Sequence, residues 1–367
     1  MIRLQHKWYN CLIEALSLDP SMFQIVVPSA PMMPTDDALW DYLNTVPSAS
    51  LTFNRSATST DRLFDQYAAM VSQTEFSQRT FEQIIGRQNF QAWSAYLASQ
   101  HPPPADNQLP ALFQNWAARN NMSIAAAGVA FLSRCILVAA MRQALVPYQG
   151  EHAKPADFMG SYADALHTLG ACGGCKFFFD SRDSSADVSD AWAADHSADE
   201  LWAGSGDGTS LSRKFATSNV TVSAEFAAYA QWTAAPGPWY SSALFGMLYG
   251  SQATPPWRAD AKPSWSDLFG PDGSLCRLVA SLLLADGGNI TVTSDATFGP
   301  IDRRTIVDYA PLGLWPCYAA SGGGVSNAVT FSQGGRMAIE IVTPPGHPVV
   351  IGENVLGTAR YLGQATS

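Results

Sequence analysis

The sequence is short of charge, and above all of basic charge. Charged residues make up 14% of its 367 residues, against about 25% in an average soluble domain. Its 21 Lys and Arg are outnumbered by 31 Asp and Glu, which gives a formal net charge of −10. Nucleic-acid-binding proteins need clustered Lys and Arg to neutralise phosphates, so we expect no nucleic acid partner. The hydrophobic fraction of 47% is sufficient for a packed core and excludes general disorder.

The sequence also lacks the short motifs that identify common enzyme classes. It contains no G-x-S-x-G, G-x-x-x-x-G-K-[ST], H-E-x-x-H or G-x-G-x-x-G pattern. A site made of His, Asp and Ser stays open as an alternative, because a triad is defined by geometry and not by sequence order. We lean against an enzyme, predict no cofactor, and keep a hydrolase-type enzyme with an unrecognised site as one alternative.

Cysteines are few and widely spaced, unlike those of a small disulfide-rich scaffold. Cys172 and Cys175 form a CxxC pair, which is a candidate redox site because the first thiolate of such a pair can be activated. The pair precedes the predicted strand 177–179, whereas a thioredoxin-like pair follows a strand and opens a helix. Structural cysteines in a glycine turn are the alternative. A second CxxC or an HxxxH is missing, so we predict no metal site.

Carboxylates cluster in residues 180–208, but they lack the D-x-[DN]-x-[DN]-G order of an EF-hand. We therefore predict a solvated loop that does not need calcium. The N-terminus lacks the apolar core and the cleavage site of a signal peptide. It is predicted to be a helix or arm packed on the core, and the cellular compartment stays open.

Residues 1–58 are interpreted as an N-terminal arm. This arm holds an extended segment over 23–27 and a short helix near 39–43, capped by Thr35 or Asp36. Residues 59–150 are predicted to be helical, because apolar residues recur with a 3.6-residue period from Leu63 onward.

Residues 122–146 are the most apolar run of the chain. The run is about long enough to cross a bilayer, which takes roughly 20 residues. However, Arg134 near its centre costs about 2.5–3.5 kcal/mol on an insertion scale. We therefore predict no constitutive membrane span but a buried central helix, with Arg134 buried and paired with a carboxylate or with backbone carbonyls.

Residues 151–367 are predicted to be rich in antiparallel strands, with helices interleaved over 241–248 and 275–284. Apolar residues alternate with polar ones in several short segments separated by Gly, Pro and Asn. The predicted strands are 177–179, 220–226, 290–292, 306–307, 329–331, 337–341 and 349–351. The fold class is therefore α+β, with a helical N-terminal portion packed with this β-rich portion, and the two portions can share one core.

Tryptophans beside proline or glycine provide the candidate contact residues. Trp239, Tyr240, Trp257 and Trp265 are predicted to contact a ligand or a membrane, because loop aromatics form sugar platforms and membrane anchors. The leading hypothesis is a non-enzymatic, surface-active or self-assembling protein, such as a toxin-like membrane-binding protein. Its partners would be membrane lipid or its own subunits. A carbohydrate-binding protein, with a glycan as its partner, is the other alternative.

Overall fold

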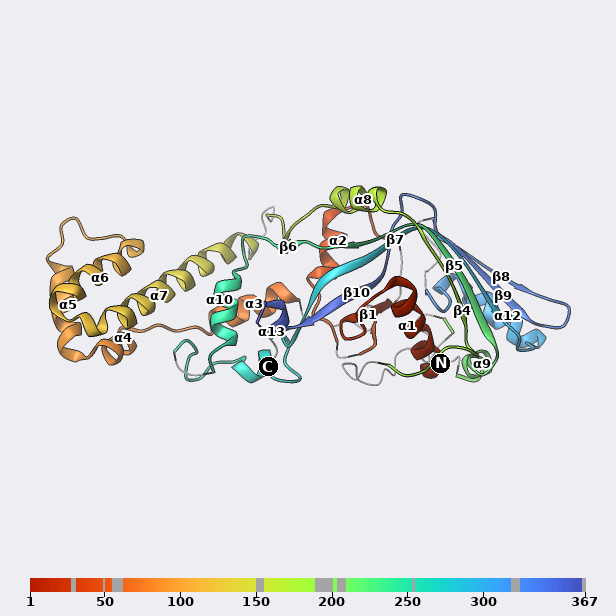
Figure 1. The fold of residues 1–367 in the computed structure, drawn as a ribbon, viewed down its shortest axis with the longest axis horizontal. Coiled ribbons are helices and arrows are strands. Elements are labelled where there is room, and N and C mark those ends of the chain that lie inside the picture. The colour runs from red at the N-terminus through yellow and green to blue at the C-terminus, as the bar shows by residue number, and fades with distance from the viewer. Residues whose placement is uncertain are drawn as a thin grey trace. The chain divides into compact units, whose positions relative to one another are not determined.

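The computed structural model describes residues 1–27, 31–48, 50–54, 62–149, 155–188, 201–202, 209–252, 255–317 and 324–364. The predicted α+β fold is confirmed, since helices lie mostly in the N-terminal half and antiparallel strands mostly in the C-terminal half (Figure 1). The chain forms two compact units. Unit 1 comprises residues 1–63, 158–235 and 277–367, and unit 2 comprises residues 64–157 and 236–276.

The described residues of unit 1 form one eight-stranded sheet. Neighbouring strands follow the order β2 (Thr52–Asn54), β1 (Phe23–Val27), β10 (Val349–Gly357), β7 (Arg277–Ser294), β5 (Val220–Trp232) and β4 (Cys175–Asp180). The first half of β7 pairs with β10, and on the same side the second half of β7 pairs with β9 (Met337–Val342). Strand β8 (Ser326–Phe331) pairs with β9. Every pairing is antiparallel except that of β1 with β2. The segment over 23–27 is thus an integral strand.

Strand β7 organises this sheet, because it pairs with β5 along one side and with β10 and then β9 along the other. The predicted helix over 275–284 is wrong, since Arg277–Ser294 is one continuous strand. Its residues from Leu282 to Ala285 are all buried, so the period-2 signal is absent, and a short apolar run does not distinguish a strand from a helix.

Two glycines lie within β7, in the segment 286–289, where Gly and Asn are more typical of a turn. Gly287 has φ of +61°, which favours glycine, and a Cβ there would lie 2.7 Å from the Cβ of Ala227. A Cβ on Gly288 would lie 2.8 Å from Oγ1 of Thr343. Glycine here marks close approach of neighbouring strands and not a reversal of the chain.

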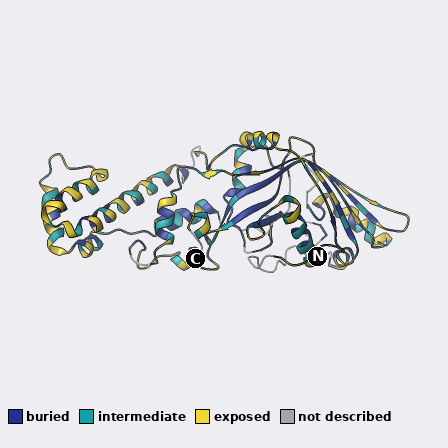
Figure 2. Ribbon diagram, in the orientation of Figure 1, coloured by how far each residue is buried: buried dark blue, intermediate teal, exposed yellow. Residues whose placement is uncertain are grey.

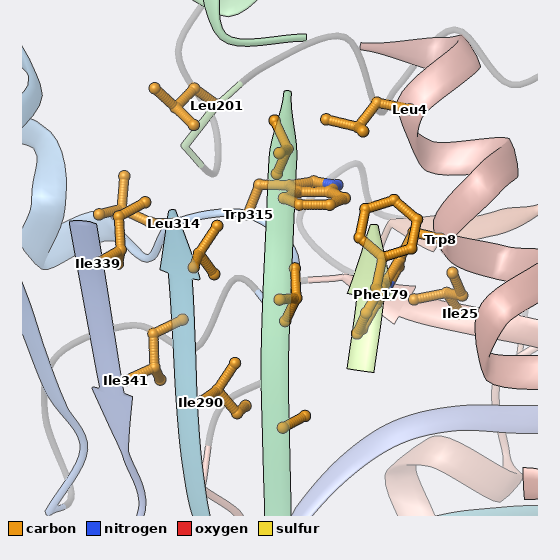
Figure 3. Packing of buried hydrophobic residues seen from close by; sticks show 14 of the residues in the cluster. Leu4, Trp8, Ile25, Phe179, Leu201, Ile290, Leu314, Trp315, Ile339 and Ile341 are labelled. Carbon is orange, nitrogen blue, oxygen red and sulfur yellow. The ribbon is translucent and has the colours of Figure 1, made fainter. Parts of the chain in front are cut away.

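Helix α1 (Ile2–Leu16) packs on this sheet through Leu4, Trp8 and Leu12, which recur every four residues and are all buried. The ring of Trp8 lies 5.6 Å from that of Phe179 on β4 and 5.8 Å from that of Trp315 (Figure 3). Nε1 of Trp315 donates a hydrogen bond to the buried side chain of Gln5 at 2.7 Å. The prediction of an N-terminal helix packed on the core is confirmed.

The other helices of unit 1 are α2 (Asp36–Leu43), α8 (Tyr162–Ala171), α9 (Thr209–Ala216), α12 (Pro300–Tyr309) and α13 (Thr358–Tyr361). Thr35 caps α2 as predicted, with Oγ1 accepting from the amide of Ala38 at 3.3 Å. The predicted strand at 306–307 is wrong, because these residues belong to α12. The adjacent apolar pair Ile306 and Val307 is too short to reveal the period of the element that contains it.

Unit 2 is helical in its described residues. It contains α3 (Leu63–Ser72, from Phe64 onward), α4 (Gln78–Ile85), α5 (Arg87–Ala98), α6 (Leu109–Asn120), α7 (Ala125–Leu145), α10 (Ser242–Tyr249) and α11 (Trp265–Phe269). The prediction of a helical region is confirmed for its described residues from Leu63 to Tyr148, although short connections such as that at Gly86 divide it into several helices, and the predicted helix over 241–248 is also confirmed. The two short strands β3 (Phe158–Met159) and β6 (Ala235–Pro236) lie where the chain passes from one unit to the other.

Candidate functional site

Helix α7 is the most unusual element of the chain. With the short 3₁₀ turns at both ends it spans Met122–Tyr148, and it is long and apolar enough to cross a membrane. At 1.5 Å per residue, the 21 residues of α7 measure about 30 Å, which is the thickness of the bilayer hydrocarbon. Only 28% of its most apolar 18-residue window is buried. The core helix of a soluble protein with this composition would be mostly covered.

The N-terminal half of α7 packs against α4 and α6 through one face. The ring of Phe131 stacks on that of Phe81 with centroids 5.0 Å apart. Gly128 faces Phe113 so closely that a Cβ would lie 2.0 Å from the ring. In the other half, Arg142 donates to the carbonyl oxygen of Thr74 at 2.6 Å, which ties α7 to the end of α3.

Much of the surface of α7 is exposed (Figure 2). Its exposed residues are mostly small: Ala126, Ala127, Ala130, Ser133, Arg134, Ala139, Ala140, Arg142 and Gln143. The predictions that α7 is a buried central helix and that Arg134 is buried and paired are therefore wrong. The alanines make the run apolar in composition, but each has little side-chain area to bury. The helix is therefore packed through its larger side chains, and the alanines remain exposed.

A groove of about 650 Å³ runs beside the second half of α7. Its lining is apolar along Leu132, Ile136 and Ala139, and polar where Asp106 and Asn107 face the helix. Cys135 also lines the groove, and burial raises the pKa of its thiol to about 11, so the thiol is protonated at neutral pH. The groove offers shape and apolar surface but no activated nucleophile.

The four predicted aromatic contact residues all belong to unit 2, where the structure joins them through a chain of packed rings. Trp239 and Trp257 are 0% and 3% exposed, and their Nε1 atoms donate to backbone carbonyls of Asp157 and Ser251. Tyr240 and Trp265 are partly buried. The intervening rings are Phe245 and Phe269. Both buried tryptophans support the fold here, and a ligand or glycan contact at these rings stays a prediction.

The predicted redox cysteines are both free thiols. Cys172 is exposed and follows the C-terminus of α8. Cys175 begins β4, and burial raises the pKa of its thiol. The burial of Cys175 opposes formation of its thiolate, whereas an activated cysteine has a lowered pKa. A redox role stays a prediction.

The remaining predicted candidates form no cluster in the part of the chain that the structure describes. No group of three or more His, Cys, Asp or Glu residues there is placed to hold a metal ion. His101, His167 and His347 are exposed, and their rings make no hydrogen bond to a described carboxylate or hydroxyl. Most of the acidic loop, residues 189–200 and 203–208, lies outside the described residues. Comparisons with protein-family models, with curated proteins and with solved structures find no match.

Proposed function

We propose that the protein binds lipid bilayers through α7, without acting as an enzyme. The observation that carries this proposal is the exposure of a helix whose length and composition suit a bilayer. The larger apolar side chains, such as Phe131 and Leu132, face α4 and α6. Release of α7 from those helices would present these side chains to the lipid, where each contributes a few tenths of a kcal/mol to about 0.6 kcal/mol.

Substitutions that change the charge of α7 test this proposal. Arg134 is exposed and has no described partner, so Arg134→Leu removes a charge near the helix centre with little effect on the fold. Ala140 is also exposed, so Ala140→Glu adds a charge without disturbing packing. A charge costs about 2.5–3.5 kcal/mol at the helix centre and less near its ends. We expect Arg134→Leu to strengthen binding to phosphatidylcholine vesicles, and Ala140→Glu to weaken it by about tenfold or more.

Vesicle co-sedimentation and dye leakage measure these effects. The matched control is Ala92→Glu, which places the same charge on an exposed position of α5. The control should bind vesicles as the unchanged protein does. The proposal fails if Arg134→Leu and Ala140→Glu leave binding unchanged, or if Ala92→Glu weakens it as much as Ala140→Glu.

Self-association through α7 is a second candidate function, and the alanines on its exposed face favour it. Small residues allow two helices to approach closely, as in membrane helix pairs. A second copy of α7 would then cover Ala126, Ala130 and their neighbours. Analytical ultracentrifugation without lipid separates the candidates. A dimer that Ala140→Glu dissociates supports self-association, and a monomer that binds vesicles supports the bilayer.

A further inference from the structure

A pocket of about 610 Å³ lies in unit 1, at the end of the sheet where β4 and β7 stop and β5 begins. Arg3 and Lys7 of α1 line one side of it. The loop after β4 contributes Arg182, the loop after α9 contributes Asn219, and the loop after β7 contributes Asp295. Figure 1 shows the start of α1 beside α9 at this place. The volume is within the range of about 300–1,000 Å³ that small-molecule sites occupy.

Positive charge predominates in this pocket, although the whole chain carries −10. Asp295 already has two partners: Oδ2 accepts from Nη2 of Arg182 at 3.1 Å, and Oδ1 accepts from the backbone amide of Asn219 at 2.8 Å. Lys7 donates to the backbone carbonyl of Ser181, which is a neutral acceptor. Arg3 has no ion-pair partner among the described residues. The charges of Arg3 and Lys7 are therefore uncompensated, and the lining has a net charge of +2.

Neutral hydrogen-bonding side chains also line the pocket. The side-chain oxygen of Asn219 accepts from Oγ of Ser181 at 3.4 Å, so its amide nitrogen is available as a donor. Thr217 brings a hydroxyl to the rim. A pocket with two uncompensated cations and an amide donor fits a compact, doubly charged anion better than a singly charged carboxylate.

We propose that this pocket binds a phosphate monoester group, whose charge of about −1.5 to −2 near neutral pH matches the lining. The group can belong to a soluble phosphate ester or to the headgroup of a phosphatidic acid lipid. The site lies in unit 1 and does not depend on α7.

Calorimetry with inorganic phosphate and with glycerol 3-phosphate tests the soluble source. Co-sedimentation with phosphatidylcholine vesicles, with and without phosphatidic acid, tests the lipid source. Arg3→Gln removes one charged donor from an exposed position and should weaken phosphate binding by about tenfold, as the loss of one charge-assisted hydrogen bond does. Arg213→Gln is the matched control, because Arg213 is an exposed arginine of the same unit outside the pocket.

Binding should be stronger at about pH 7.5 than at about pH 5, because the phosphate dianion forms above about pH 6. Binding of the soluble esters identifies a soluble ligand. Binding only to phosphatidic acid vesicles, with the excess over phosphatidylcholine lost in Arg3→Gln, identifies a lipid headgroup. The proposal is overturned if neither arm binds, or if Arg213→Gln weakens binding as much as Arg3→Gln. Ala140→Glu should leave phosphate binding unchanged, so this proposal and that of α7 can fail separately.

Discussion

Gly128 shows how a single missing side chain positions α7. Its Cα faces the ring of Phe113, and an added Cβ would lie 2.0–2.8 Å from three ring atoms. Alanine is favoured over glycine in a helix by about 1 kcal/mol, but overpacking costs about 1–3 kcal/mol. Because the ring is buried among α4, α5 and α6, we expect Gly128→Ala to destabilise the protein by about 1–2 kcal/mol net, measured by urea denaturation.

Gly170 in α8 provides the comparison for this prediction. It lies in a helix as Gly128 does, but no atom lies within 4 Å of an added Cβ. Gly170→Ala should therefore be neutral or stabilise the protein by up to about 1 kcal/mol. If both substitutions change the free energy of unfolding in the same direction, the contact with Phe113 does not decide the outcome.

Thiol reactivity is the second prediction at the scale of residues. Burial raises the pKa values of Cys11 and Cys135 to about 11 and that of Cys317 to about 12, whereas Cys172 is exposed. Only the thiolate reacts with a disulfide reagent such as Ellman's reagent. We expect the fastest phase at mildly alkaline pH to disappear in Cys172→Ser and to persist in Cys175→Ser, because Cys172 is the one cysteine that is exposed. Survival of the fastest phase in Cys172→Ser would contradict this assignment.

Among the elements, α12 depends on Asp302 at its start. The carboxylate accepts from the backbone amide of Gly299 at 3.2 Å and pairs with Nζ of Lys214 at 2.9 Å. The hydrogen bond from Lys214 lowers the pKa of Asp302 below its ordinary value of 3.8. A carboxyl pKa that is lower in the folded state than in the unfolded state stabilises the fold at pH values above the unfolded-state pKa. This contribution is lost as the pH falls through the folded-state pKa.

We therefore expect Asp302→Asn to destabilise the protein by about 0.5–1 kcal/mol at neutral pH, because both partners are partly exposed and screened. The difference from the unchanged protein should shrink as the pH falls below 3.8, where the carboxyl group loses its charge in both states. Urea denaturation at neutral pH and below pH 3.8 measures the free energy of unfolding of both proteins. A difference that is constant with pH would assign the effect to helix capping by a neutral side chain.

The sequence predicted elements well where one face of an element is buried. The helix α3 and the strands β5, β8 and β9 carry a clear period, and each was predicted over part or all of its observed range. The first half of β7 is apolar on both faces, which removes the period and led to the wrong helix at 275–284. The pairing of β1 with β2 and β10 is non-local, and no local pattern records it.

The candidate sites were less predictable than the elements, because they depend on contacts between residues that are distant in the sequence. The apolar run of α7 is evident in the sequence, but its exposure depends on how many neighbours cover it, and composition does not reveal that. The phosphate pocket joins Arg3, Arg182 and Asn219 from three distant segments, so no spacing or motif marks it. A lone arginine in the sequence carries no signal until the fold places its neighbours around it.

At the scale of the whole molecule, charge should control the approach to membranes. The net charge of −10 opposes contact with anionic lipid at neutral pH, where the membrane surface is also negative. Asp and Glu become protonated near their reference pKa values of about 3.9 and 4.3. Hydrogen bonds hold the pKa values of Asp19, Asp164, Asp267 and Asp302 low, so these groups keep their charge to lower pH.

We expect binding to phosphatidylserine vesicles to be weak at about pH 7 and to strengthen as the pH approaches about 4.5, close to those reference values. Neutral phosphatidylcholine vesicles are the control, because repulsion between like charges is absent there and the pH effect should be smaller. An equal pH effect on both vesicles would show that acid acts by releasing α7 and not by removing charge. If the protein neither binds nor permeabilises either kind of vesicle at either pH, the proposal of bilayer binding is wrong. Self-association through the exposed alanines of α7 is then the remaining candidate.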